Sequence, residues 1–98
     1  MSTDRYSISS PLVAKDQLHR VMAQAMAEGQ FELAVQAGEW LIEELARTPL
    51  ELGESRDVLP HLNLKVRLAF VRPIAVQFAV HEESKQVFVR GFAYCGTS

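Results

Sequence analysis

The sequence has almost no cysteine, because Cys95 is the single thiol in 98 residues. One cysteine cannot form an intramolecular disulfide, and it cannot supply the ligands of a Cys-rich zinc site. A lone thiol persists most easily in a reducing compartment. The composition therefore excludes the disulfide-stabilised secreted classes and predicts a cytoplasmic protein.

Long hydrophobic runs are also missing. No stretch approaches the roughly 18 apolar residues of a membrane-spanning helix. Residues 1–5 lack the basic-then-apolar order of a signal peptide. We therefore expect no membrane as a partner. With 48% hydrophobic side chains, 98 residues suffice for one small core, and we expect a single domain over residues 1–98.

The chain lacks an excess of charge of either sign, because ten Lys and Arg face twelve Asp and Glu, a formal net charge of -2. This balance gives no sign of a nucleic-acid-coating protein or of an acidic tail. The distribution is uneven. Residues 1–57 carry five basic and ten acidic side chains, a net charge of -5, whereas residues 58–98 carry five basic and two acidic ones, a net charge of +3.

Signatures of cofactor and metal binding are absent from the sequence. The Gly-Glu-Ser stretch at residues 53–55 has no lysine and no preceding apolar strand, so it does not match a phosphate-binding loop. Three histidines lie far apart, with no spacing that would bring two imidazole nitrogens onto one metal ion. They are His19, His61 and His81. We therefore expect no metal and no cofactor.

Two amphipathic helices are predicted within residues 11–47. In the first, apolar side chains recur at the 3.6-residue helical period and form one stripe. The second repeats this spacing over residues 31–45, and Pro49 prevents its continuation. Because only Gly29 and Gln30 separate them, an antiparallel hairpin is the simplest connection. Gly38 in the second helix indicates close approach to a neighbour.

A linker over residues 48–63 follows, in which we expect a turn or a short helix. The hydrophobic period then changes to 2 over residues 64–71, 74–81 and 86–94. Short connections between these segments favour an antiparallel three-strand meander over residues 64–94. A further short strand is expected near Tyr6, at the edge of the sheet.

The predicted fold class is α+β, with the helical hairpin packed on one face of a small antiparallel sheet, in the order β-α-α-β-β-β. The two periodicities also predict which side chains share the core between the helices and the sheet. They are Leu18, Met22, Val35, Leu41, Ile42, Leu45, Val66, Leu68, Val76 and Phe78.

The last strand is ambiguous, because either Val87 and Val89 or the aromatic residues beside them could face the core. In the first case one outer sheet face gathers basic, amide and aromatic side chains that suit phosphate or protein binding. The residues of this candidate binding face are Lys65, Arg67, Gln77, Phe88, Arg90, Phe92 and Tyr94. The same alternation is typical of a solvated sheet face.

This layout resembles the RelE/ParE superfamily of bacterial toxins over residues 6–94. The similar features are the element order, residues 40–45 before a proline, the Leu-Glu-Leu-Gly-Glu-Ser-Arg stretch at residues 50–56, and the strands at residues 64–71 and 74–80. The resemblance implies a toxin of a type II toxin-antitoxin module that is wrapped by an antitoxin. RelE-like members cut messenger RNA on the ribosome, and ParE-like members poison DNA gyrase.

The resemblance carries over to few catalytic positions. Lys65 and Arg67 match the two basic residues that RelE-like nucleases place on the first meander strand. The two arginines expected further on fall near Ala75 and Cys95. Since losing one donor to a transition-state anion typically costs 10²- to 10³-fold in rate, we expect little or no messenger RNA cleavage and assign no catalytic residue.

We therefore expect a toxin-like protein that acts by binding a macromolecular target, with an antitoxin as partner and DNA gyrase or the ribosome as candidate target. The alternative is a non-toxic module of the same fold, a homodimer that hides the outer sheet face. A ribosome-dependent ribonuclease using Lys65 and Arg67 ranks third.

Overall fold

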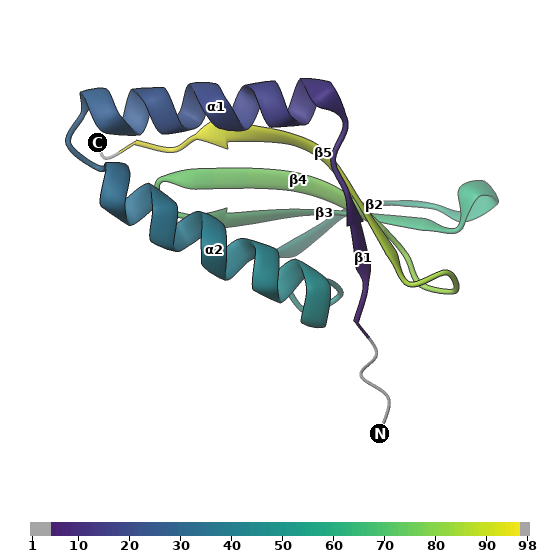
Figure 1. Cartoon of the computed structure of the whole chain (residues 1–98). Coiled ribbons are helices and arrows are strands. Elements are labelled where there is room, and N and C mark those ends of the chain that lie inside the picture. The colour runs from purple at the N-terminus through teal and green to yellow at the C-terminus, as the bar shows by residue number, and fades with distance from the viewer. Residues whose placement is uncertain (1–4, 97–98) are drawn as a thin grey trace.

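The computed structural model of the protein describes residues 5–96, which form two helices and a five-stranded sheet (Figure 1). Among these residues, no helix is long and apolar enough to cross a membrane. The elements are β1 (Ser7–Ser9), α1 (Leu12–Ala27), α2 (Phe31–Arg47), β2 (Glu54–Leu59), a 3-10 helix (Pro60–Leu62), β3 (Leu64–Val71), β4 (Ile74–His81) and β5 (Gln86–Tyr94).

The strands lie in the order β1-β5-β4-β3-β2. The predicted antiparallel meander is present as β3, β4 and β5, and β2 pairs antiparallel with β3. The short strand expected near Tyr6 is β1, but it runs parallel to β5. The sheet is therefore mixed, and the prediction of a purely antiparallel sheet is wrong for this edge.

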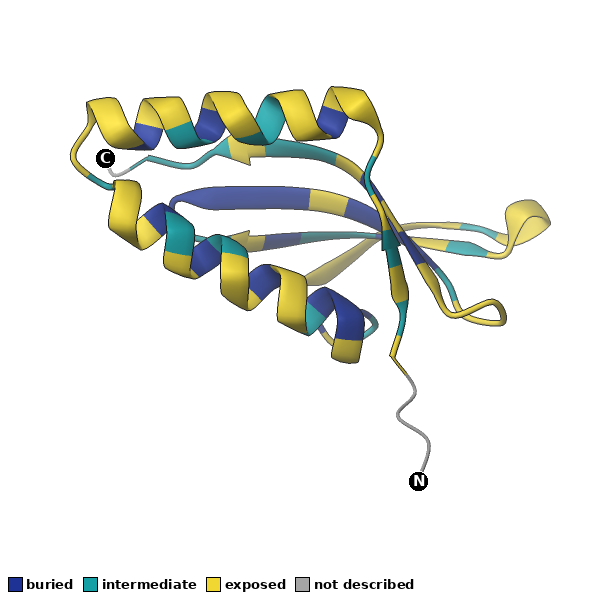
Figure 2. Cartoon of the chain, in the orientation of Figure 1, coloured by how far each residue is buried: buried dark blue, intermediate teal, exposed yellow. Residues whose placement is uncertain are grey.

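Both predicted helices are confirmed, and each ends just before the residue that the sequence predicts as its stop. Gly29 follows α1 with a φ of +73°, a left-handed conformation that glycine adopts without strain. Pro49 follows the end of α2. The helices diverge from the turn between them, and α1 runs alongside β5 (Figure 1). In Figure 2 their buried residues lie on the sides that face the sheet.

The predicted linker over residues 48–63 contains a strand that the sequence does not indicate. β2 has five exposed residues and one half-buried residue, so neither of its faces carries an apolar pattern. A period of 2 appears only where one face is buried, which explains why the pattern misses this strand. The short helix expected in this segment is the 3-10 turn at Pro60–Leu62.

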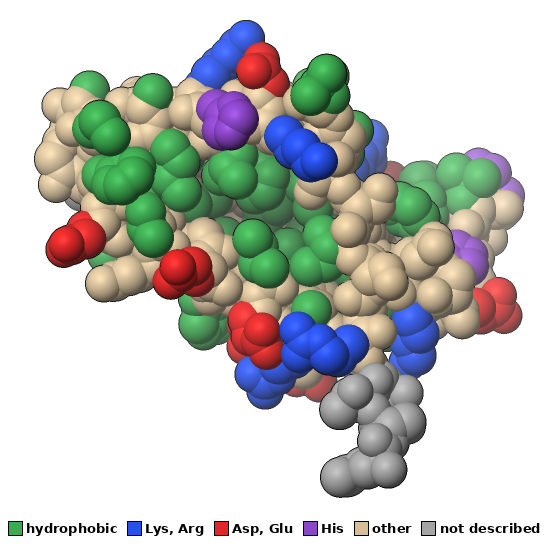
Figure 3. Space-filling view, viewed as in Figure 1, with side chains coloured by type: hydrophobic (Ala, Val, Ile, Leu, Met, Phe, Trp, Pro, Cys, Tyr) green, Lys and Arg blue, Asp and Glu red, His purple; other side chains and the backbone are tan. Residues whose placement is uncertain are grey.

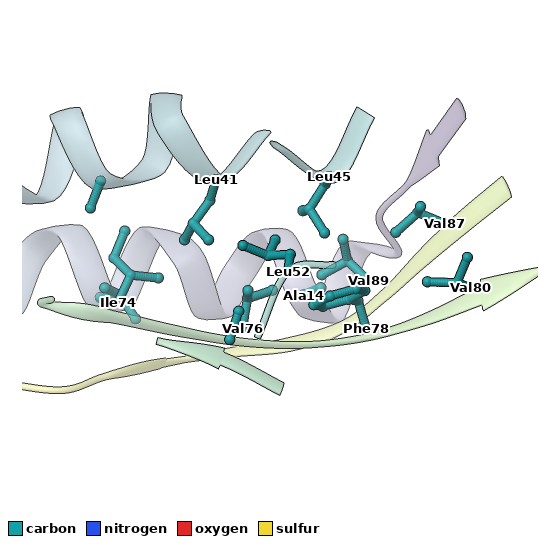
Figure 4. Packing of buried hydrophobic residues seen from close by; sticks show 13 residues of the cluster. Ala14, Leu41, Leu45, Leu52, Ile74, Val76, Phe78, Val80, Val87 and Val89 are labelled. Atoms are coloured by element: carbon teal, nitrogen blue, oxygen red, sulfur yellow. The ribbon is translucent and has the colours of Figure 1, made fainter. Parts of the chain in front are cut away.

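The core lies between the helices and one face of the sheet (Figure 4). Of the predicted members, Leu41, Leu45, Val76 and Phe78 are buried there, and Leu18 and Met22 pack against them half-buried. Val35 is half-buried. The prediction is wrong for Ile42, which is 56% exposed.

The register of β3 corrects the predicted core at two further positions. Directly opposed residues of antiparallel strands share a face. Val66 lies opposite Ala79 and Leu68 opposite Gln77, so both point to the face away from the helices. Arg67 lies opposite the core residue Phe78. The apolar alternation of β3 therefore faces away from the helices, the reverse of the prediction.

A β-bulge in β5 explains why neither predicted orientation of the last strand holds. Gln77 pairs with Gly91 while its neighbour Phe78 pairs with Val89, which leaves Arg90 as an extra residue. A one-residue insertion moves all later side chains to the other face. Val89 before the bulge and Phe92 after it consequently both lie on the helix side.

Candidate functional site

The face of the sheet opposite the helices, hereafter the outer face, is formed by alternate residues of β3, β4 and β5. On this face Val66, Ala75 and Ala79 are buried. Phe70 and Phe88 are exposed on it, at 59% and 37%. An uncovered face with exposed aromatic rings is typical of a surface that binds a partner.

Two β-bulges direct two arginines to this face. In β2 the register shifts between Ser55 and Asp57, which leaves Arg56 without an opposed residue, as Arg90 is left in β5. Bulges re-aim side chains that a regular strand would point elsewhere. Both arginines line one open cavity of about 400 Å³ together with Gln77. The structure therefore brings together two guanidinium groups from the strands that flank β3 and β4.

The rest of the cavity lining is small or apolar. Besides the two arginines and Gln77, the cavity is lined by Gln17, Leu68, Ala75, Gly91, Phe92 and Ala93. Among the residues that the structure describes, this lining includes no carboxylate and no imidazole. The cavity consequently presents two positive charges over a nearly flat floor, an arrangement that suits a carboxylate or another planar anion bound by two-pronged hydrogen bonds.

The two arginines have few competing partners among residues 5–96. Nη1 of Arg56 lies 3.7 Å from a carboxylate oxygen of Glu54, and both side chains are more than half exposed. Such exposed pairs contribute about 0–1 kcal/mol and rearrange easily. Arg90 forms no ion pair with any residue of the described chain. Both guanidinium groups can therefore turn toward a ligand.

Gln17 closes the side of the cavity next to α1. β1 pairs only with the first part of β5, so the backbone of the later part lacks a strand neighbour on that side. The Phe92 N–H instead donates a hydrogen bond to Oε1 of Gln17 at 3.0 Å. A Cβ at Gly91 would lie 2.7 Å from the same oxygen, so glycine leaves room for this contact.

The structure does not bring the seven predicted binding residues onto one face. Gln77, Phe88 and Arg90 lie on the outer face. Phe92 and Tyr94 lie on the helix side, where they pack half-buried against the core. The prediction that these aromatic residues accompany Arg90 is therefore wrong, because the bulge reverses their orientation.

Tyr94 has a structural partner on the helix side. Its hydroxyl donates a hydrogen bond of 2.8 Å to Oε1 of Glu28, just after α1. Partial desolvation, and then this contact with the Glu28 carboxylate, raises the pKa of the Tyr94 hydroxyl above its usual value. The contact ties the end of β5 to the end of α1.

Lys65 and Arg67, the residues matched to nuclease positions, also face the helix side and are both engaged. Nζ of Lys65 lies 3.0 Å from Glu82. Nε of Arg67 donates to the carbonyl oxygen of Leu52 at 2.9 Å, and its Nη2 donates to that of Gly53 at 3.0 Å. Neither side chain lines the cavity between Arg56 and Arg90.

The other side chains that could act as a base or nucleophile, His81 and Cys95, lie outside the cavity lining. Nδ1 of His81 lies 2.7 Å from Oγ of Ser84 in the turn after β4. Cys95 is half-buried and donates its backbone N–H to the carbonyl oxygen of Pro73. Within residues 5–96, no three His, Cys, Asp or Glu side chains lie where they could share a metal ion. The cavity thus presents two guanidinium groups, and the carboxylate nearest to them that forms an ion pair is that of Glu54, beside Arg56.

Sequence reasoning missed Arg56 and Gln17. Arg56 falls in the predicted linker, and Gln17 falls on the polar side of a helix, so neither position carries a periodic signal. Comparison of the chain with protein-family models, with curated proteins and with solved structures found no match.

Proposed function

We propose that the protein is a toxin-like component of a type II toxin-antitoxin module, similar in layout to the RelE/ParE superfamily, that acts by binding an acidic segment of a target protein on its outer face. The observation that carries this proposal is the pair of bulge arginines over one cavity. DNA gyrase and the ribosome are the candidate targets, and an antitoxin is the candidate inhibitor.

The chemistry of the outer face favours a protein ligand. Arginine and aromatic side chains supply most of the energy in protein interfaces, because they bury a large area and still offer polar contacts. Phe70 and Phe88 are exposed on the same face as the Arg56–Arg90 cavity. An acidic segment could place carboxylates between the guanidinium groups and apolar side chains against these rings.

The element order supports the likeness to RelE/ParE toxins, because a helical hairpin precedes the strands of an antiparallel meander and covers one face of it. The chain adds strand β2 between the hairpin and this meander. Binding is favoured over RNA cleavage, since Lys65 pairs with Glu82 and Arg67 holds two backbone carbonyls. Each would have to give up these contacts to reach a scissile phosphate.

The test is induced expression in a bacterial host, with growth as the readout. We expect the unaltered chain to inhibit growth, and the double variant Arg56→Ala with Arg90→Ala to lose most of this effect. Arg72→Ala is the matched control, because Arg72 is an exposed arginine outside the cavity. Equal soluble levels and equal melting temperatures would show that all three proteins fold.

Two results would overturn the proposal. The first is normal growth with the unaltered chain at a high soluble level, which would favour the non-toxic interaction module. The second is cleavage of translated messages, detected by primer extension and abolished by Lys65→Ala or Arg67→Ala. That result would establish the ribonuclease instead of a binding mechanism.

A further inference from the structure

An apolar groove lies between α1 and α2 on the side of the molecule opposite the outer face. Its volume is about 350 Å³, and its lining is almost entirely hydrophobic. Figure 3 shows hydrophobic side chains gathered along the space between the two helices. The lining includes Ile8, Leu18, Leu41, Ile42, Val89 and Phe92.

The groove is open because the helices diverge and because a glycine lies in its wall on α2. Gly38 lines it, and a Cβ there would lie 3.7 Å from Met22 and 3.8 Å from Ile74, which are ordinary contact distances. The close approach expected at Gly38 from the sequence is therefore absent. A large apolar side chain remains exposed in the groove wall, since the lining residue Ile42 is 56% exposed.

A lysine and a histidine border the groove on one side, and glutamates border it on the other. Lys15 lines it from α1, and His19 lies one turn further along that helix. On α2, Glu39 and Glu43 directly follow the lining residues Gly38 and Ile42. In Figure 3 basic, acidic and histidine side chains lie over the upper helix, where Asp16 pairs with Arg20, and acidic side chains with basic ones beside them lie along the lower helix, where Glu43 pairs with Arg5.

These charges are arranged so that the groove complements itself. Lys15 and His19 lie twelve and eight residues before the end of α1 at Ala27. Glu43 and Glu39 lie twelve and eight residues after the start of α2 at Phe31. Because the helices form a hairpin, each basic residue lies level with an acidic residue across the groove.

We propose that this groove is the interface of a homodimer, in which a second copy of the chain sits on it by a twofold rotation about the axis of the groove. That rotation places α1 of one protomer over α2 of the other. Lys15 then meets Glu43 of the other copy, and His19 meets Glu39, twice in each dimer. The exposed apolar side chains of the two helices become the centre of the interface.

A second copy of the chain matches the charged borders of the groove better than an unrelated helix does. An unrelated helix would need acidic residues along one side and basic residues along the other, matched to both borders. The chain itself already carries this pattern in the correct order. In the monomer both carboxylate oxygens of Glu43 accept hydrogen bonds from Arg5, at 3.2 and 3.4 Å, and both side chains are about half exposed. Such exposed pairs rearrange easily, so the Glu43 carboxylate can turn toward Lys15 of a second copy.

The experiment measures the mass of the full chain by sedimentation equilibrium over a range of concentrations. We expect a dimer whose dissociation constant rises at least about tenfold in Ile42→Glu, in Lys15→Glu and in Glu43→Lys. All three substitutions are at exposed positions, so we expect them to fold, and circular dichroism would check this. Arg72→Glu, which reverses the charge of an exposed arginine outside the groove lining, is the control.

A mixture of Lys15→Glu and Glu43→Lys tests the direction of the rotation axis. Each variant alone opposes like charges in its own dimer. In the mixed dimer the introduced glutamate faces the introduced lysine, and the unaltered Lys15 faces the unaltered Glu43, so association should return toward the unaltered level. A monomeric chain at all concentrations, a dimer insensitive to Ile42→Glu, or a mixture no tighter than its components would overturn the proposal. Growth inhibition plays no part in this readout.

Discussion

At the scale of single residues, Arg67 fixes the segment that leads from α2 into β2. It donates hydrogen bonds to the backbone carbonyls of Leu52 and Gly53, and Leu52 belongs to the core. Lys65, two residues earlier on the same face, reaches only the exposed Glu82. The sequence predicts one shared function for Lys65 and Arg67, but in the structure Arg67 holds the loop before β2, whereas Lys65 forms only an exposed ion pair.

This difference predicts unequal effects of the two alanine substitutions. Arg67→Ala removes two charge-assisted hydrogen bonds from a partly buried loop and should lower the free energy of unfolding by about 1.5–3 kcal/mol. Lys65→Ala removes one exposed ion pair and should change it by less than about 1 kcal/mol. Urea unfolding of both variants provides the measurement. Equal midpoints would show that Arg67 does not hold the loop.

Two glycines with left-handed backbone form a second matched pair. Gly29 has a φ of +73° with open space around its missing Cβ, and Gly53 has a φ of +70° with the backbone of Leu68 and Ala69 against it. Gly29→Ala should lower the free energy of unfolding by about 1 kcal/mol, because alanine adopts a left-handed backbone less easily than glycine. At Gly53 the added Cβ would also clash with the backbone of Leu68 and Ala69, so Gly53→Ala should lower the free energy of unfolding by clearly more than Gly29→Ala. A thermal melt that ranks them in reverse would contradict this account.

At the scale of elements, the helices and the three meander strands are predictable because each buries one face. The face that a strand presents is not predictable in the same way. In β3 Arg67 lies on the helix side, where it donates to the carbonyl of Leu52, and Val66 and Leu68 therefore lie on the outer face. In β5 a single extra residue, Arg90, reverses every side chain after it. No periodicity could reveal β2, whose residues are nearly all exposed.

The same reasoning explains how much of the candidate site the sequence contains. Gln77, Phe88 and Arg90 are identifiable because they alternate with buried residues along their strands, although Arg90 itself lies in the bulge of β5. Arg56 and Gln17 are not, since one sits in a bulge of an exposed strand and the other on the polar side of a helix. Bulge positions depend on pairing between strands, which one strand's own pattern does not contain.

Two neighbouring residues of α2 allow a test of which side of the helix is buried. Leu41 is 1% exposed and its neighbour Ile42 is 56% exposed, although the helical period predicts both in the core. Leu41→Ala should lower the free energy of unfolding by about 2–5 kcal/mol, through lost burial and the cavity left behind. Ile42→Ala should change it by less than about 1 kcal/mol, because the exposed side chain loses little burial. The comparison should use dilute protein, at which any dimer has dissociated.

At the scale of the whole molecule, the sheet separates two surfaces of different character. The groove between the helices is apolar and bordered by both signs of charge, whereas the cavity of the outer face is lined by two arginines and, within residues 5–96, by no acidic side chain. Among residues 5–96, Phe92 lines both the groove and the cavity, and the two linings have no other residue in common. Because the linings are otherwise separate, binding at one face need not require binding at the other.

The separation predicts that variants of the outer face leave self-association intact. Arg56→Ala with Arg90→Ala removes charge on the side opposite the groove, and substitutions without shared partners usually have independent effects. Sedimentation equilibrium of this double variant should give the same dissociation constant as the unaltered chain, while its effect on bacterial growth is lost. If the double variant instead becomes monomeric, the outer face itself is the dimer interface. That outcome would assign the arginines to self-association and would favour a homodimeric module that hides this face over a protein that holds a target there.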